Sequence, residues 1–150
     1  MLEEFEIEEF IAKYIKNDMI LGIGSSKAGE MFLKKIAIKA EDEGLHLKVV
    51  PTSHHMAGIL SSLNLPIASL NEETSLDLAV EFVDLVDEDF NFVKRESQSL
   101  VRDKMIAQCA EILMVVVRKE NFVKVTSNSC HFEPGQCAFY DKLPEHLAHT

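Results

Sequence analysis

Apolar residues in the first third of the chain follow two alternating patterns, a helical spacing and short unbroken runs. From Phe5 to Ile15 they recur every three or four residues, which predicts an amphipathic helix. An apolar run at residues 19–22 predicts a short buried strand. The helical spacing returns over residues 27–43, and Gly44 predicts the point where this second helix ends. The chain therefore begins as helix, strand and helix.

The same alternation continues further along the chain. It predicts strands at residues 46–50, 66–70, 76–80, 90–93 and 112–117, and helices at residues 54–63 and 99–110. The run at 112–117 is uncharged and rich in β-branched residues, which is typical of a central strand buried on both faces. Alternating strands and helices favour right-handed crossovers and parallel pairing. The predicted fold class is therefore α/β, a three-layer Rossmann-like domain with a mostly parallel sheet.

The composition fits a globular domain and excludes several kinds of partner. The 150 residues are 47% hydrophobic and 27% charged, enough for one domain with a sizeable core. The net charge of −10 argues against nucleic acid and anionic membranes, because both attract Lys and Arg clusters. No apolar run suits a membrane span, and the acidic N-terminus has the wrong sign for a signal peptide. Three cysteines make no disulfide framework, so we expect a cytoplasmic protein.

Candidate chemistry lies where predicted strands end, because ligands of open parallel sheets collect at the carboxyl edge. Three segments leave such ends, at residues 24–27, 52–54 and 81–87. The first combines a glycine, two serines and a helix start, so its backbone N–H groups could hold a phosphate, with Lys27 adding charge. That pattern alone is weak, and a plain turn with a serine N-cap is the favoured alternative. The second segment offers hydroxyls to a sugar, and the alternative for Ser53 is an N-cap.

The third segment is acidic and precedes a lysine. Glu81 and Asp84 are followed by Lys94 and Asp103 within a short stretch of sequence. Paired carboxylates beside a lysine could move protons and stabilise an oxyanion. The alternative is a solvated acidic surface, which composition alone favours.

Taken in order, these segments resemble the ribose-5-phosphate isomerase A family. The family's phosphate loop, G-x-G-T-G-S-T, corresponds to Gly22, Ile23, Gly24, Ser25, Ser26, Lys27 and Ala28. Its motifs V-P-T-S, D-G-A-D-E-V-D, L-N-L-I-K-G-G-G and A-L-x-R-E-K correspond to residues 50–53, 81–87, 90–97 and 99–104. No single motif is specific, but the ordered set at compatible spacing is fairly specific, and it covers residues 7–123.

The resemblance implies a reaction and a set of site residues. The family interconverts ribose 5-phosphate and ribulose 5-phosphate through an enediolate, with no metal and no cofactor. Asp103 stands at the position of the family's base, a glutamate, and Lys94 and Asp84 match residues that handle sugar oxygens and ring opening. Glu81 stands at the first aspartate of D-G-A-D. The implied phosphate and sugar contacts are Gly24, Ser25, Ser26, Lys27, Ser53 and Asn121, the last in place of a lysine.

Several departures from the family pattern support a second hypothesis. Asp103 is one methylene shorter than the family's base, and Glu81 is one methylene longer than the aspartate it replaces. Phe82 and residues 95–97 replace glycines of the family's loops. The alternative function is therefore a non-catalytic sugar-phosphate-binding or regulatory relative with a degenerate site.

The end of the chain carries the remaining expectations. We expect an isomerase-like domain at residues 1–125 and a C-terminal extension at 126–150 with one added strand at 136–140. The residues after Val123 are too few for the family's second small domain. The resemblance implies a small phosphorylated sugar as ligand and a homodimer as assembly. Four potential zinc ligands have a spacing unlike a standard finger, so we expect no metal: Cys130, His131, Cys137 and His146.

Overall fold

Five strands form the main sheet of the chain. The computed structural model describes residues 4–73, 75–87, 92–94, 100–118, 122–123 and 137–142. The sheet has the order β2-β1-β3-β6-β8. Its strands are β1 (Ile20–Ile23), β2 (Lys48–Pro51), β3 (Leu76–Phe82), β6 (Ala110–Arg118) and β8 (Cys137–Lys142). All neighbouring pairs are parallel except β6 and β8, so the predicted α/β class with a mostly parallel sheet is confirmed.

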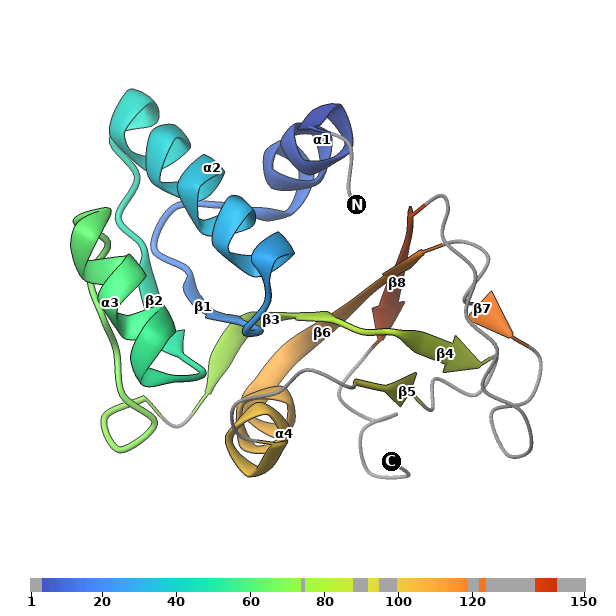
Figure 1. Cartoon of the computed structure of the whole chain (residues 1–150). Helices are drawn as coiled ribbons and strands as arrows, with labels where there is room; N and C mark the ends of the chain where they lie inside the picture. The colour runs from blue at the N-terminus through green and yellow to red at the C-terminus, as the bar shows by residue number, and fades with distance from the viewer. Residues whose placement is uncertain are drawn as a thin grey trace.

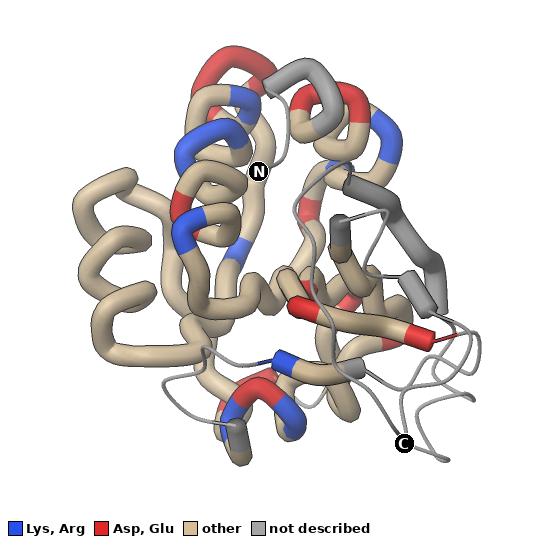
Figure 2. The backbone as a smooth tube through the Cα atoms, turned by 45° about the vertical axis from the view of Figure 1, so that its right-hand side comes forward, with Lys and Arg blue, Asp and Glu red and all other residues tan. Residues whose placement is uncertain are grey.

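Helices cover both faces of this sheet and produce three layers. They are α1 (Glu4–Tyr14), α2 (Lys27–Glu43), α3 (His54–Ser62) and α4 (Leu100–Cys109). Figure 1 shows α1, α2 and α3 on one side of the sheet and α4 on the other. Helix α2 carries charges of both signs, with lysines along most of its length and three consecutive acidic residues in its last turn (Figure 2). Of the helices that the structure describes, none combines the length and apolar character needed to cross a bilayer.

The apolar core is divided between the two faces. Side chains of α1, α2 and α3 pack with Leu78 and Val80 of β3 and with Met114 and Val116 of β6. The opposite face packs α4 through Ile106 against the alternate residues of the same strands. Successive residues of a strand point to opposite faces, so a strand covered on both sides reads as an unbroken apolar run. That is why the run at 112–117 correctly predicted a central strand.

Two regions differ from the sequence-based expectations. Residues 66–70 do not form the predicted strand, because pairing is limited to one parallel bridge between Ile67 and Val49. Pro66 has no N–H to donate, although its carbonyl accepts from the Val49 N–H at 2.9 Å. The acidic segment 81–87 is mostly strand, because β3 runs through Phe82 and β4 begins at Leu85. A small sheet of order β5-β4-β7 is formed by β4 (Leu85–Asp87), β5 (Phe92–Val93) and β7 (Phe122–Val123).

Candidate active site

The turn after β1 lies against side chains from distant parts of the chain. Gly24 continues the pairing with β3, because its N–H donates to the Val80 carbonyl at 2.8 Å. A Cβ atom on Gly24 would lie 2.6 Å from Glu81 Oε2 and 3.1 Å from Lys94 Nζ. Only glycine fits unless the Glu81 carboxylate shifts. The absence of a side chain therefore lets the predicted phosphate turn and the acidic cluster meet in one place.

The other glycine of the same motif has a different task. A Cβ atom on Gly22 would collide with the Ile106 side chain of α4. Gly22 thus allows α4 to pack closely on the sheet. It lies within β1, two residues before Gly24. The structure assigns it to packing, whereas the motif alone groups it with the phosphate loop.

Three buried hydroxyls join the ends of β1 and β2. Ser25 Oγ lies 2.6 Å from Thr52 Oγ1 and 3.2 Å from Ser53 Oγ, and Thr52 donates to the Ile23 carbonyl at 3.1 Å. Each of these residues is at most 8% exposed. Thr52 is fully buried and was not among the contacts that the resemblance implies, although the V-P-T-S motif contains it.

Serine side chains also start both neighbouring helices. Ser26 Oγ accepts from the Gly29 N–H at 2.9 Å at the start of α2, and Ser53 Oγ accepts from the Met56 N–H at 3.1 Å at the start of α3. The N-cap alternatives are therefore confirmed for both turns. Phosphate or sugar contact by the same residues stays a prediction. Lys27 is exposed at the first position of α2.

The acidic segment contains a buried ion cluster instead of a solvated surface. Lys94 Nζ lies 2.8 Å from Glu81 Oε2 and 3.2 Å from Asp103 Oδ2. The side chains of Lys94, Glu81 and Asp103 are 5%, 2% and 9% exposed. Glu81 lies on β3, Lys94 directly follows β5, and Asp103 lies in the first turn of α4. With all three ionised, the cluster carries one net negative charge.

Burial changes the proton affinity of one member of the cluster. Desolvation raises the pKa of Glu81 to about 7, and the opposing attraction of Lys94 offsets this only in part. Glu81 Oε1 is buried and accepts no hydrogen bond from the residues that the structure describes. A carboxyl group with this pKa exchanges a proton readily near neutral pH.

The remaining predicted residues fall into two groups. Asp84 lies at the bend between β3 and β4, half-buried, and its N–H donates to the carbonyl of Val93 at 2.9 Å. It thus holds the segment that carries Lys94. Asn121 lies outside the described residues, as do Cys130, His131 and His146. Among the described residues, no group of three or more His, Cys, Asp or Glu is placed to hold a metal ion.

The bulky Phe82 does not enter the cluster. Its ring packs edge-on against Phe32 of α2, with centroids 6.0 Å apart, on the sheet face opposite to Glu81. Strand alternation separates these two neighbours. Phe82 therefore adds core packing under α2 and does not occupy the space around Glu81.

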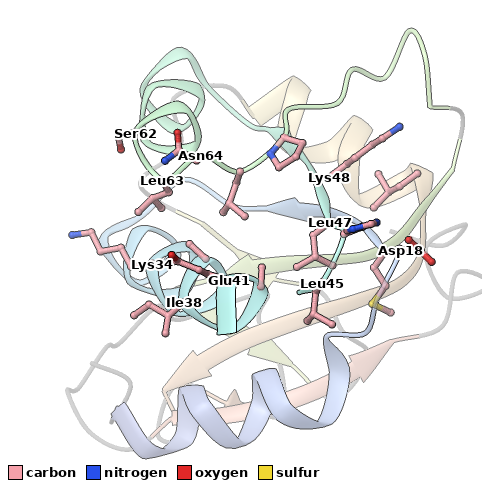
Figure 3. A pocket seen from close by; sticks show the side chains of 17 residues that line it. Asp18, Lys34, Ile38, Glu41, Leu45, Leu47, Lys48, Ser62, Leu63 and Asn64 are labelled. Carbon is pink, nitrogen blue, oxygen red and sulfur yellow. The ribbon is translucent and has the colours of Figure 1, made fainter. Parts of the chain in front are cut away.

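A groove lies at the opposite ends of the same strands. It has a volume of about 1010 Å³ and lies between the C-terminal half of α2, the end of α3 with residues 63–66, and the starts of β1 and β2. Figure 3 shows Leu45, Leu47 and Leu63 along it, with Lys34 and Glu41 at its side. None of the predicted site residues lines this groove. We define it as the amino-edge groove.

Comparison with known proteins identifies the family. A family model described as ribose 5-phosphate isomerase A (phosphoriboisomerase A) matches residues 48–132. Ribose-5-phosphate isomerase A of Methanococcus aeolicus is 33% identical over 74% of this chain and 48% of that protein. The protein of the same name from Streptococcus agalactiae is 31% identical over 75% of this chain and 51% of its own length.

Solved structures show the same fold. A D-ribose-5-phosphate isomerase in complex with phospho-erythronic acid is 27% identical, with a TM-score of 0.73 over 80% of this chain and 53% of that chain. The ribose 5-phosphate isomerase of Plasmodium falciparum, at 20% identity, matches with a TM-score of 0.74 over 80% and 52%. The chain thus spans about half the length of the curated relatives it matches. Sequence and fold together place the chain in the ribose-5-phosphate isomerase A family.

Proposed function

We propose that this chain interconverts ribose 5-phosphate and ribulose 5-phosphate as an aldose–ketose isomerase. The observation that carries the proposal is the buried Lys94 ammonium between the carboxylates of Glu81 and Asp103, next to the turn at Gly24. Isomerisation needs a group that takes and returns a proton and a positive charge that stabilises an oxyanion. The cluster contains both. The proposed catalytic residues are Glu81, Lys94, Asp103 and Asp84.

The turn beside the cluster supports a phosphorylated substrate. Backbone N–H groups at the start of α2 and the positive end of its dipole favour an anion near residues 24–27. In both bonds described for it, Ser53 Oγ acts as the acceptor, which leaves its hydrogen to donate to a sugar or phosphate oxygen. We propose Gly24, Ser25, Ser26, Lys27, Ser53 and Asn121 as the contacts.

We also propose that residues 1–125 form the isomerase-like unit and that residues 126–150 extend it. The support is β8, which pairs antiparallel with β6 from Cys137 to Lys142 and so adds a strand to the main sheet. The homodimer stays a prediction.

The test is turnover of ribose 5-phosphate, measured as ribulose 5-phosphate formed. The background control is the double variant Glu81→Gln, Asp103→Asn, purified in the same way. It removes both carboxylates at nearly constant volume, so it is inactive whichever of them is the base. We expect turnover above this control. Binding of ribose 5-phosphate in calorimetry without such turnover would assign the alternative function, and neither binding nor turnover would reject both.

A further inference from the structure

We propose that Glu81, and not Asp103, is the carboxylate that carries the migrating proton in this chain. The inference rests on the isomerase activity proposed above and reassigns its central residue. The family resemblance places the base at Asp103. The two carboxylates differ in length from the family pattern in opposite directions, so their reach into the site is also exchanged.

The first argument is the position of the Glu81 carboxylate. The longer side chain extends from β3 to the end of β1, where Oε2 lies 2.6 Å from the site that a Cβ atom on Gly24 would occupy. A sugar whose phosphate binds at the turn after Gly24 would therefore lie beside Glu81. Asp103 approaches from α4, and its Oδ2 contacts Lys94.

The second argument is how the two oxygens of Glu81 are used. Oε2 accepts from Lys94 at 2.8 Å, which fixes the orientation of the carboxylate. Oε1 is buried and has no hydrogen-bond partner among the described residues. A buried acceptor without a partner costs stability in an ordinary structural ion pair. At Oε1 the structure thus holds an acceptor suited to a substrate proton. Asp103 Oδ1 is buried in the same way, so it is the position of the Glu81 carboxylate beside Gly24 that distinguishes the two residues.

Proton affinity agrees with this placement. The pKa of Glu81, raised by burial to about 7, populates both protonation states at neutral pH. A residue that first removes a proton and then returns it works best under this condition. Asp103 then serves as a positioning residue, because its negative charge holds the Lys94 ammonium in place.

The reaction balances with these groups alone. Glu81 takes the proton from C2 of the open-chain aldose, and the C–H electron pair becomes the C1=C2 bond. The carbonyl electron pair moves to O1, where Lys94 stabilises the oxyanion. The protonated carboxyl then returns its proton to C1, while the O2 proton moves to O1 and C2 becomes the carbonyl carbon. No oxidant, reductant or other reactant is consumed.

The test compares pH–rate profiles of Glu81→Gln and Asp103→Asn, with Glu41→Gln of the amino-edge groove as the matched control. If Glu81 is the base, kcat/KM rises with pH near pH 7 as Glu81 loses its proton, and we call this rise the limb of the profile. We expect Glu81→Gln to lose about 10³-fold in kcat and to abolish this limb. Asp103→Asn should lose less of its kcat than Glu81→Gln and should keep the limb. The negative charge of Asp103 contributes to raising the pKa of Glu81, so its removal should move the limb to lower pH. Glu41→Gln should match the unchanged protein.

Three results would overturn the inference. A limb that survives in Glu81→Gln and disappears in Asp103→Asn would return the role to Asp103 while the isomerase activity stands. An active protein whose Glu81 carboxyl titrates near its ordinary pKa, measured by carbon NMR without substrate, would do the same. This titration needs no variant, so it decides the question even if Glu81→Gln fails to fold. Absence of turnover in the unchanged protein would reject the proposed function and this inference with it.

Discussion

The two ends of β1 and β2 carry regions of opposite character. At the carboxyl ends, charged and hydroxyl side chains are buried against one another around Gly24. At the amino ends, the amino-edge groove has an apolar lining with exposed charges at its sides, such as Lys48 at 57% exposure. Buried charged groups are the more reactive ones, because burial changes their proton affinity. Charges at the side of an open groove stay hydrated and keep their ordinary chemistry. The region at the carboxyl ends is therefore the chemical one.

The largest expected difference between the two regions comes from removing one lysine in each. Lys94→Met leaves two buried carboxylates without their cation, so we expect a loss of about 3–5 kcal/mol in the free energy of unfolding. Lys48→Met removes an exposed ion pair with Glu73, and its loss should stay under about 1 kcal/mol. Urea unfolding at pH 8 measures both. Equal losses would show that burial of the cluster has no energetic weight.

The pH dependence of stability follows from Glu81. Its pKa is about 7 in the folded chain and 4.5 by reference, so between these values the folded state binds more protons. Stability from this group is therefore highest at low pH and falls as pH rises from about 4.5 to 7, by about 3 kcal/mol.

Other groups titrate in the same range, so the quantity to compare is the difference between the unchanged protein and Glu81→Gln. Chemical unfolding in steps from pH 4.5 to 8 measures it. A difference that stays constant with pH would contradict the raised pKa of Glu81.

Glycine substitutions test the difference between the site and the rest of the molecule with a smaller effect on stability. Gly24→Ala places a methyl group 2.6 Å from Glu81 Oε2, so the carboxylate must shift. Displacement of a reacting group by about 1 Å can lower turnover about 10²-fold. Gly58→Ala in α3 is the matched control, because nothing lies within 4 Å of its Cβ position. It should leave turnover unchanged and raise stability by up to about 1 kcal/mol. Similar turnover in both variants would remove the argument for close contact at Gly24.

The smallest effect is expected in the amino-edge groove. Ile38 is 54% exposed on α2, so Ile38→Ser should alter the free energy of unfolding by at most about 0.5 kcal/mol. Turnover should also be unchanged. Thermal unfolding and the isomerase assay measure these quantities together. A loss of turnover comparable with that of Gly24→Ala would connect the groove to the site and end the comparison drawn above.

Local signals in the sequence correctly predicted much of the fold. The helical spacing and Gly44 predicted α2 with the bounds Lys27–Glu43, and the apolar run at 112–117 predicted the core of β6. The short strands β4 and β7 were missed, since two or three residues carry no readable periodicity. The ordered motifs predicted the family, which the comparisons confirmed.

The sequence by itself determined which side chains are available for the chemistry and which helices and strands carry most of them. Only the tertiary structure decided that Glu81 is buried beside Lys94 and Gly24, that its pKa is raised, and that Phe82 points to the other face. Periodicity and caps depend on residues a few positions apart, so a sequence displays them directly. Desolvation depends on which distant segments cover a charge, and that is decided when the sheet and its helices pack together.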